Sequence, residues 1–432
     1  MKNFFATLSL AALLTHGVSI PANATSEITV MTRNIYLGAD VGKALSLIPD
    51  LPAAAQYMWD QMRKTDFESR SKLLADEINQ YKPDVIGIQE ATIWRCQKNL
   101  WTKATTIYDF VEILLKQLSG EYEVAALNSA TAYNPGFSIS PIPYLTKVID
   151  PGVFQRIFSQ DSAFCGFETG DTLLVKKQLQ SEVINLGNTE YEASYSIVPT
   201  LMTIYRGYTW ADIKINGTPT RFITTHLESL WDENKIPNSA RQARQLIADT
   251  SNTKMPLIIM GDFNSDPKDP REKGRLNPGL QPVESLNCPP NTSTCSAYKL
   301  MIENDFIDAG PNSLDPKNFT WGMNAQLSGP DLARKSAAQK FGNQFGFTDR
   351  LDYVFVKNKV RVNYAEIIGV KPPYASDHAG VVVKILIQNG ENSISPALDA
   401  HKPFPVSFWQ WVGIFLILLI TWIFWRKSKK LS

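Results

Sequence analysis

The chain has 432 residues, of which 44% are apolar and 20% are charged. This is the composition of a globular protein with enough length for one large or two medium cores, and it excludes a disordered or fibrous chain. The 43 basic side chains are almost balanced by 42 acidic ones, which leaves a formal net charge of +1. Charge therefore gives no argument for nucleic acid binding, for which a basic surplus or stripe is expected.

The N-terminus has the pattern of a secretory signal peptide. A basic residue, Lys2, precedes a largely apolar run at 4–14, and small residues come just before Ala24. We expect cleavage after Ala24, which removes residues 1–24. A buried first helix is the alternative, but the run is short and ends in the small-x-small pattern of a cleavage site.

Short β-rich runs then alternate with amphipathic runs of helical spacing, as expected of a mixed α/β domain. Pro83 should end the helix expected at 66–80. Asn216 and Gly217 form a strong hairpin signal, so the strands beside them should be antiparallel neighbours. The Thr-Pro pair that follows should lengthen this loop beyond two residues. The expected helices cover 66–80 and 239–250, and the expected strands cover 26–36, 84–90, 172–177, 208–215, 220–227, 256–263, 352–357 and 381–387.

Two stretches of the chain lack sustained periodicity. Residues 94–165 contain several prolines, and we interpret them as a helix followed by a long insertion that forms one wall of the substrate cleft. The aromatic side chains of this insertion could instead belong to the core. Residues 266–294 are expected to form a loop.

The chain has four cysteines, Cys96, Cys165, Cys288 and Cys295. An oxidising compartment outside the cytoplasm permits disulfides. Cys288 and Cys295 enclose a short loop and are the expected bridge. Zinc binding is the alternative, but no CxxC pair and no neighbouring histidine support it.

An apolar run at 406–425 has tryptophans near both ends and basic residues directly after it. We expect this run to span a membrane once, after a polar linker at 389–405 and before a basic cytoplasmic tail at 426–432. The body of the chain, residues 25–388, would then lie outside the cytoplasm. A bacterial inner membrane facing the periplasm suits this arrangement, and a eukaryotic cell surface is the alternative. A buried core helix fits the length and the basic flank less well.

Polar residues suited to a hard metal lie at the ends of several expected strands. Asp262 and Asn264 are two residues apart, so in an extended chain their side chains point to the same face. Asp377 and His378 come shortly before the last expected strand. Such oxygen-rich clusters suit a hard divalent cation and an activated water, and do not suit a soft metal.

Six short motifs occur in the order that is typical of one known family. They resemble the endonuclease/exonuclease/phosphatase superfamily, which includes pancreatic-type deoxyribonucleases, abasic-site endonucleases, inositol polyphosphate phosphatases and neutral sphingomyelinases. The resemblance implies a catalytic domain over residues 25–388, folded as a four-layered α/β sandwich in which two mixed β-sheets pack face to face between helices. The motifs are TRNIY with Asn34, IGIQEA with Glu90, TTHLES with His226, GDFNSDP with Asp262 and Asn264, RLDYVF with Asp352, and SDHAGV with Asp377 and His378.

The resemblance implies a metal site and hydrolysis of phosphate esters without a covalent intermediate. Asn34 and Glu90 would hold Mg²⁺, or Mn²⁺ or Ca²⁺ in its place, and Asp377 would add its negative charge directly or through water. A phosphate ester repels anionic nucleophiles, so such a site must neutralise phosphate charge and also supply a hydroxide-like water.

The resemblance also implies catalytic roles for the remaining motif residues. Asp262 would orient or deprotonate the attacking water, and Asn264 would donate a hydrogen bond to the phosphate. His378, kept cationic by Asp352, would bind a phosphoryl oxygen or take part in proton transfer. His226 would stabilise the transition state or protonate the leaving oxygen.

Each motif residue alone also has a structural interpretation. His226 could be an ordinary hydrogen-bonded strand residue, and Glu90 could form a salt bridge. The ordered set favours the functional interpretation. We interpret Asp349 and Arg350, by contrast, as a structural charge pair or part of a loop.

Two positions depart from the nuclease branches of the family. Abasic-site endonucleases carry an acid where this chain has Tyr36, and pancreatic-type nucleases carry an arginine where it has Thr92. The motifs around Asn34, Glu90 and His226 are most similar to those of the sphingomyelinase branch.

The sequence therefore predicts a membrane-tethered, extracytoplasmic, metal-dependent phosphodiesterase that acts on phospholipid or a related organic phosphate. An extracytoplasmic nuclease is the second hypothesis, and a binding protein that kept the fold without catalysis is the third. The expected partners are the phosphate-ester substrate, lipid or nucleic acid, and the membrane that holds the C-terminal helix. No protein partner is indicated.

Overall fold

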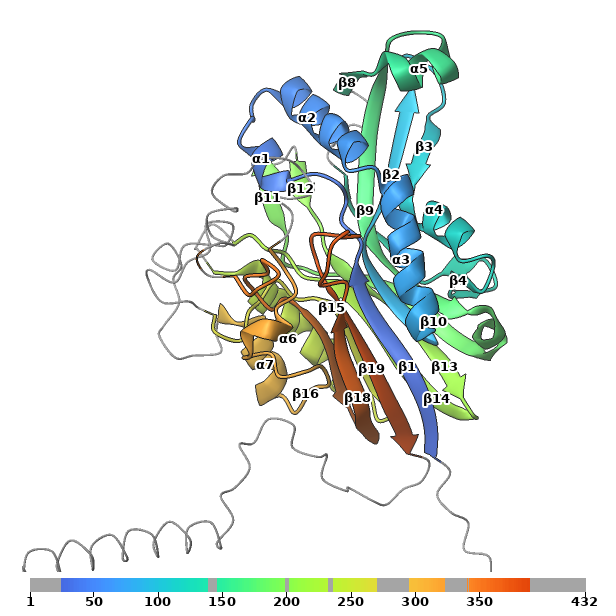
Figure 1. Ribbon diagram of the computed structural model, residues 1–432, viewed down its shortest axis with the longest axis vertical. Helices are drawn as coiled ribbons and strands as arrows, with labels where there is room; N and C mark the ends of the chain where they lie inside the picture. Colours follow the sequence, from blue (N-terminus) through green and yellow to red (C-terminus); the bar gives the residue numbers. More distant parts are fainter. Residues whose placement is uncertain are drawn as a thin grey trace, which may run out of the picture.

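Two mixed β-sheets form the centre of the molecule (Figure 1). The computed structural model describes residues 25–138, 146–198, 202–231, 236–269, 295–322, 340 and 342–388. Within these residues the first sheet runs in the order β18 (Val360–Ile368), β19 (Gly380–Gln388), β1 (Thr25–Asn34), β2 (Val85–Gln97), β9 (Ser162–Lys176) and β4 (Tyr122–Val124). β3 (Thr105–Asp109) extends it beside β2, and β7 (Tyr133–Ser138) and β8 (Thr146–Ile149) extend it beside β9.

The second sheet has six strands among the described residues. Their order is β10 (Val183–Glu190), β13 (Gly207–Ile215), β14 (Thr218–His226), β15 (Leu257–Asp262), β17 (Asp352–Lys357) and β16 (Ile307–Asp308). Both sheets are mixed, because β1 is parallel to β2 and β14 is parallel to β15, whereas their other pairs are antiparallel. Two small ribbons pair β5 (Ala126–Leu127) with β6 (Ala130–Thr131) and β11 (Tyr195–Val198) with β12 (Met202–Ile204).

Most helices begin at a side chain that caps the free backbone N–H groups of their first turn. The side chain of Asp66, for example, accepts from the backbone N–H of Ser69 at the start of the predicted helix. Equivalent caps start five other α-helices of the described residues: an aspartate caps α1, α2, α4 and α5, and a serine caps α7. The helices are α1 (Val41–Leu45), α2 (Leu51–Lys64), α3 (Phe67–Tyr81), α4 (Phe110–Gln117), α5 (Pro151–Phe158), α6 (Asn238–Thr250) and α7 (Ala297–Glu303), with short 3₁₀ turns η1 (Lys177–Glu182) and η4 (Pro316–Asn318).

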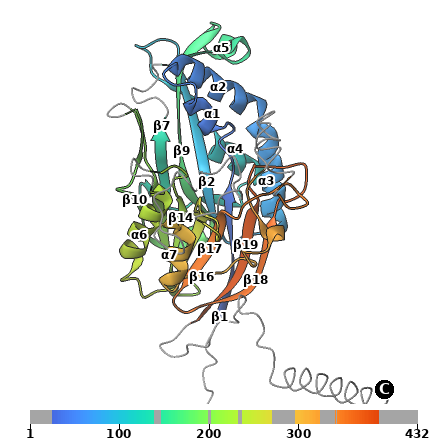
Figure 2. The same cartoon turned by 90° about the vertical axis from the view of Figure 1, so that its left-hand side faces the viewer.

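Buried apolar side chains fill the three spaces between neighbouring layers. One such core packs α2, α3 and α4 against the outer face of the first sheet, and another packs α6 and α7 against the outer face of the second. The third lies between the sheets, where Gly87 permits a close approach, since a Cβ there would come within 2.9 Å of Cβ of Met260. Figure 2 shows the helices on opposite sides of the paired sheets. The predicted arrangement of two mixed sheets between helices is confirmed.

The six sequence motifs meet because strand ends of both sheets share one edge of the sandwich. β1 and β2 run parallel with Asn34 opposite Gln89, so the next residue, Glu90, lies level with the end of β1. Gln89 donates from Nε2 to Oγ1 of Thr224 in the second sheet over 2.8 Å, which holds the two sheets together beside this edge. The edge therefore receives side chains from both sheets.

The hairpin around Asn216 and Gly217 is tighter than predicted. β13 and β14 are antiparallel neighbours as expected, but Ile215 pairs directly with Thr218, so the loop has two residues. Both loop residues have positive φ, 48° and 84°, the backbone conformation of a type I′ turn. The prediction of a longer loop was wrong because a turn of this kind needs no further residues.

The helix expected within residues 94–165 is present as α4, but much of the rest of this stretch forms strands of the first sheet and not a loop-like insertion. β2 continues to Gln97 and pairs with β9 along most of its length. β3, β7 and β8 add further strands to the same sheet, and α4 and α5 lie between them. Pro135 lies within β7, where it marks an irregular strand at the register shift between Gly136 and Phe137. The aromatic side chains of Trp94, Phe110 and Phe154 lie in the core.

The two cysteines without a predicted partner form a disulfide. Cys96 of β2 is bonded to Cys165 of β9, at opposite positions of the antiparallel pair. Cys295 is also disulfide-bonded, but the predicted bridge to Cys288 involves a residue outside the described ranges.

The predicted signal peptide at 1–24, the linker at 389–405, the membrane span at 406–425 and the tail at 426–432 all lie outside the described residues. Within the described part of the chain, no helix has the length and apolar character needed to cross a membrane.

Candidate active site

Three neighbouring strands of the second sheet place site residues in one row. Asp262 ends β15, and the register sets it opposite His226, which ends β14, and opposite Asp352, which begins β17. Parallel strands end at the same edge, and the antiparallel strand β17 starts there, so one edge presents all three side chains. All three are buried.

Asn34 connects the two sheets at this edge. Its amide Nδ2 donates to Oε1 of Glu90 and to Oδ2 of Asp262, each over 3.1 Å. Its Oδ1 accepts from the backbone N–H of Tyr36 over 2.9 Å, which fixes the orientation of the amide. Asn34 thus brings the carboxylates of Glu90 and Asp262 into one site.

A β-bulge aims Glu90 into the site. The register between β2 and β9 shifts between Ile88 and Ala91, and Glu90 has a φ of 60°. This left-handed conformation is rare for a residue with a Cβ, and such strain is concentrated at functional sites. The second carboxylate oxygen of Glu90 accepts from the backbone N–H of Leu37 over 2.5 Å. Glu90 is half-buried, so its carboxylate can still reach a ligand.

Asp262 lies between two imidazoles. Its Oδ2 is 3.3 Å from Nε2 of His226 and 3.5 Å from Nε2 of His378. Its Oδ1 accepts from the backbone N–H of Asn264 over 2.9 Å. Burial raises the pKa of Asp262 to about 7, a shift that the charge of His378 opposes and the carboxylate of Asp352 favours. A carboxylate with a pKa near 7 can take a proton from water near neutral pH.

His378 forms the predicted pair with Asp352. Nδ1 of His378 is 2.9 Å from Oδ2 of Asp352, and both side chains are buried. Burial alone would lower the pKa of His378, but the carboxylates of Asp352 and Asp262 outweigh it and raise this pKa to about 10. His378 is therefore an imidazolium at neutral pH.

His226 has different surroundings. Its Nδ1 is 3.2 Å from Nη1 of Arg206, and its Nε2 is 3.1 Å from Nδ2 of Asn264. Burial, then the positive charges of Arg206 and His378, lower the pKa of His226 well below its usual value. The two site histidines consequently differ in charge, His226 being neutral.

Asp377 lies beside the site and is linked to it through Ser376. Ser376 Oγ donates to the backbone carbonyl of Asn34 over 2.8 Å and lies 3.4 Å from Oδ1 of Asp377. Direct contacts therefore join seven of the eight predicted site residues, and Ser376 links Asp377 to the end of β1.

The prediction missed three charged residues that surround His226, namely the buried Asp171 and Glu228 and the half-buried Arg206. Oδ2 of Asp171 accepts from the backbone N–H of His226 over 3.1 Å, and burial raises the pKa of Asp171 to about 8. An acid within the apolar run of β9 was a signal that could have found Asp171. Arg206 comes directly before β13, and no sequence pattern distinguishes it.

Asp349 and Arg350 are buried, and they do not enter the contacts among the site residues described above. Oδ2 of Asp349 accepts from Oγ1 of Thr348, and Nη1 of Arg350 donates to the carbonyl of Asn318 over 2.9 Å. These contacts agree with the structural interpretation of both residues.

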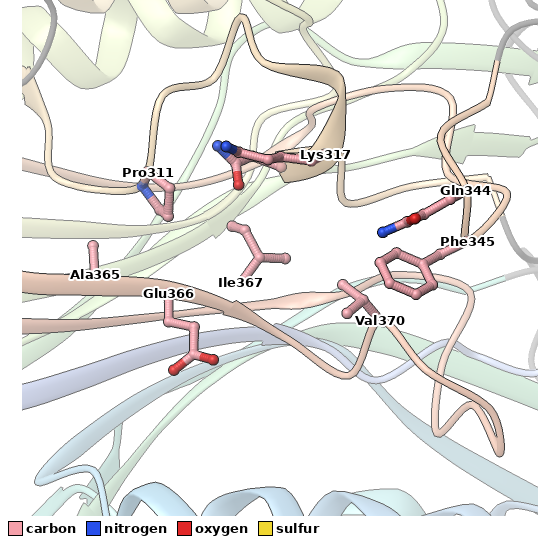
Figure 3. A pocket seen from close by; sticks show the side chains of 9 residues that line it. Pro311, Lys317, Gln344, Phe345, Ala365, Glu366, Ile367 and Val370 are labelled. Carbon is pink, nitrogen blue, oxygen red and sulfur yellow. The ribbon is translucent and has the colours of Figure 1, made fainter.

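A separate cavity of about 350 Å³ opens beside β18 (Figure 3). Its lining combines apolar side chains with the charged Lys317 and Glu366. It contains none of the predicted site residues, so it is not the candidate active site. The lining residues are Pro311, Lys317, Asn318, Gln344, Phe345, Ala365, Glu366, Ile367 and Val370.

Several solved structures match most of this chain at low sequence identity and with TM-scores below 0.5. An endonuclease/exonuclease/phosphatase family protein from Bacteroides thetaiotaomicron is 13% identical, with a TM-score of 0.44 over 85% of this chain and 100% of that chain. A mannosyl-6-phosphatase from Bacteroides thetaiotaomicron is 14% identical, with a TM-score of 0.41 over 83% and 99% of the two chains. Truncated TDP2 from Caenorhabditis elegans is 15% identical, with a TM-score of 0.40 over 83% and 97%.

A comparison with curated proteins found no match. The sequence profile of the Endonuclease/Exonuclease/phosphatase family, however, matches residues 34–378. This range begins at Asn34, ends at His378 and includes every residue of the site. The chain therefore belongs to the endonuclease/exonuclease/phosphatase family, whose members are metal-dependent phosphoesterases and nucleases.

Proposed function

We propose that this protein is a metal-dependent phosphodiesterase that acts on phospholipid or a related organic phosphate. The observation that carries the proposal is the position of Asp262, a buried carboxylate in contact with a cationic His378 and a neutral His226. The base can activate a water molecule, and donors beside it can bind the phosphoryl oxygens.

The side chains at the end of β1 and in the β2 bulge fit a hard divalent ion. Glu90 and Asp377 offer carboxylate oxygens, the donors that Mg²⁺ prefers, and Asn34 would add its amide oxygen by turning Oδ1 away from the Tyr36 N–H. A bound Mg²⁺, Mn²⁺ or Ca²⁺ would neutralise charge on the phosphate and lower the pKa of a water molecule.

Asp262, Asp352 and His378 form a second group whose possible ligand atoms all lie within 4.8 Å of one another. This group fits a metal less well, because a cationic His378 has no lone pair to offer. We therefore assign Asp262, Asp352 and His378 to proton transfer and phosphate binding, and the metal to the oxygen donors at Glu90, Asn34 and Asp377.

The chain's own residues would then divide the work of hydrolysis. Asp262 would orient the attacking water and accept its proton, since its pKa of about 7 suits a base near neutral pH. His378, held by Asp352, would neutralise a phosphoryl oxygen. Asn264 would donate a hydrogen bond to the phosphate as its charge increases in the transition state, and His226 would hold the carboxylate of Asp262 in place.

The choice of lipid over nucleic acid rests on the predicted tether and on charge. A membrane span at 406–425 would hold the site near a lipid surface, and a net charge of +1 gives no general attraction for nucleic acid. The Cys96–Cys165 disulfide supports a location outside the cytoplasm, where disulfides persist. We propose the periplasmic face of a bacterial inner membrane, with the signal peptide at 1–24 removed.

Hydrolysis assays on the full-length chain test this proposal. With Mg²⁺ present, we expect cleavage of sphingomyelin and of a bis-aryl phosphodiester, and little cleavage of DNA or RNA. Asp262→Ala and His226→Ala should abolish the activity, whereas Asp249→Asn, an exposed change on α6, should not. Cleavage of nucleic acid alone would favour the nuclease hypothesis, and no cleavage of any substrate would favour a binding protein.

A further inference from the structure

The donors and acceptors around His226 determine where its ring proton lies. Nη1 of Arg206 is hydrogen-bonded to Nδ1 of His226 over 3.2 Å. A guanidinium has donors and no acceptor, so Arg206 must be the donor and Nδ1 must carry a lone pair. The single proton of the neutral ring then lies on Nε2.

The second ring nitrogen faces a suitable acceptor. Nε2 of His226 is 3.3 Å from Oδ2 of Asp262 and 3.1 Å from Nδ2 of Asn264. Nδ2 of Asn264 also donates to the carbonyl of Leu227 over 2.7 Å, so it is a nitrogen and not the amide oxygen. Of these two neighbours, only Asp262 can accept the Nε2 proton.

Arg206 is itself held in place from two sides. Its Nε donates to Oε2 of Glu228 over 3.2 Å, and Glu228 is only 1% exposed. Oε1 of Glu228 accepts from the backbone N–H of Leu230 over 3.1 Å, which fixes the carboxylate. The backbone carbonyl of Arg206 accepts from Tyr191 N over 2.8 Å. The half-buried guanidinium of Arg206 therefore bridges two buried side chains, those of Glu228 and His226.

We propose that Arg206, oriented by Glu228, is a positioning residue that keeps His226 as a neutral imidazole with its proton on Nε2. This inference rests on the proposed function and assigns different duties to the two histidines. His226 donates a hydrogen bond and keeps its proton, because losing it would leave an imidazolate. The positive charge beside the phosphate is supplied by His378, and His226 is not the acid that protonates the leaving oxygen.

Nitrogen NMR on the full-length, metal-free chain tests this inference without an activity assay. The chain has four histidines, so ¹⁵N-histidine labelling with a tag free of histidine gives few signals, and the spectrum of His226→Gln identifies that of His226. Near pH 7 we expect an unprotonated Nδ1 and a protonated Nε2. A wild-type ring that is protonated on Nδ1, or on both nitrogens, would overturn the inference.

Variants then test whether Arg206 causes this state. Arg206→Met should move the ring toward the other tautomer or the imidazolium, and Glu228→Gln should have a smaller effect in the same direction. Arg221→Met is the matched control, because Arg221 forms an ion pair with Asp212 on the same sheet. An unchanged His226 spectrum in folded Arg206→Met would refute the role of Arg206.

Kinetics distinguish a positioning role from a structural one. On the bis-aryl phosphodiester, Arg206→Met should lower kcat by roughly 10- to 100-fold with little change in KM, and Arg206→Lys should restore part of it. A KM effect alone would count against the inference. If only the proposed function is wrong, the wild-type chain will show no hydrolysis although the NMR signal of His226 is as expected. If only the inference is wrong, the chain will hydrolyse the substrate but the NMR signal will show another protonation state of His226.

Discussion

At the scale of single residues, the site holds two histidines in different charge states around one carboxylate, with His378 cationic and His226 neutral. His378 has a carboxylate, Asp352, on its far nitrogen, whereas His226 has a guanidinium, Arg206, in the corresponding place. The first arrangement stabilises an imidazolium and the second excludes it. The group that contacts Nδ1, Asp352 in one case and Arg206 in the other, therefore determines the charge of each imidazole.

Replacing Asp352 should therefore change His378 in a measurable way. Asp352→Asn keeps the side-chain shape but removes the charge, so the pKa of His378 should fall from about 10 toward or below its ordinary 6.5. We expect kcat to fall by roughly 100-fold or more, because the phosphate loses its cationic partner. An NMR titration of His378 measures the pKa, and Asp249→Asn is the control. A pKa that stays near 10 would show that Asp352 is not its cause.

The sequence was sufficient for the residues that take part in short motifs. Asp262 and His378 each lie in such a motif, and the structure brings them together. Arg206 and Asp171 could not be found in this way, because both act on His226 from other strands or loops. Their role depends on the register of β9, β13 and β14, which no local pattern specifies.

At the scale of elements, β2 and β9 form a long antiparallel pair closed by the Cys96–Cys165 disulfide. The bridge joins residues 69 positions apart, so it restricts the unfolded chain considerably. We expect Cys96→Ala/Cys165→Ala to lower the free energy of unfolding by roughly 2–4 kcal/mol. Urea unfolding measures this change, with Cys288→Ala/Cys295→Ala as the comparison. Equal unfolding midpoints for wild type and Cys96→Ala/Cys165→Ala would contradict it.

Helices and strands with clear local signals were predicted well. α3 was located by its apolar spacing and Pro83, and β15 by its apolar run. The extension of β2 beyond Glu90 was missed, because the bulge interrupts its alternation and its partner β9 lies far along the chain. Long-range pairing, and not local propensity, decided these elements.

At the scale of the whole molecule, buried ionisable groups should make stability depend on pH. The pKa of His378 is about 10 in the folded protein and 6.5 when unfolded, so its stabilising contribution is complete below 6.5 and is lost as pH rises toward 10. Asp171 has a folded pKa of about 8, above its unfolded 3.8, so it too favours the folded state less as pH rises to 8. The pKa of His226 is lowered in the folded protein, so His226 disfavours the folded state as pH falls below 6.5.

We therefore expect the free energy of unfolding of the metal-free protein to fall between about pH 6.5 and pH 9. Urea unfolding in a chelating buffer at several pH values measures this slope. Asp352→Asn should flatten it, because His378 then no longer retains its proton in the folded state. A stability that rises with pH across this interval would be inconsistent with the charges assigned to the site.

The first and last strands of the described chain, β1 and β19, are hydrogen-bonded neighbours. Asn34 ends the first of these strands, and His378 comes directly before the last. During synthesis, β1 can pair early with β2, but its antiparallel partner β19 exists only after residues up to 388 have been made. A nascent polypeptide therefore carries no complete site, because Asn34 and His378 come together only when the first and last described strands have paired.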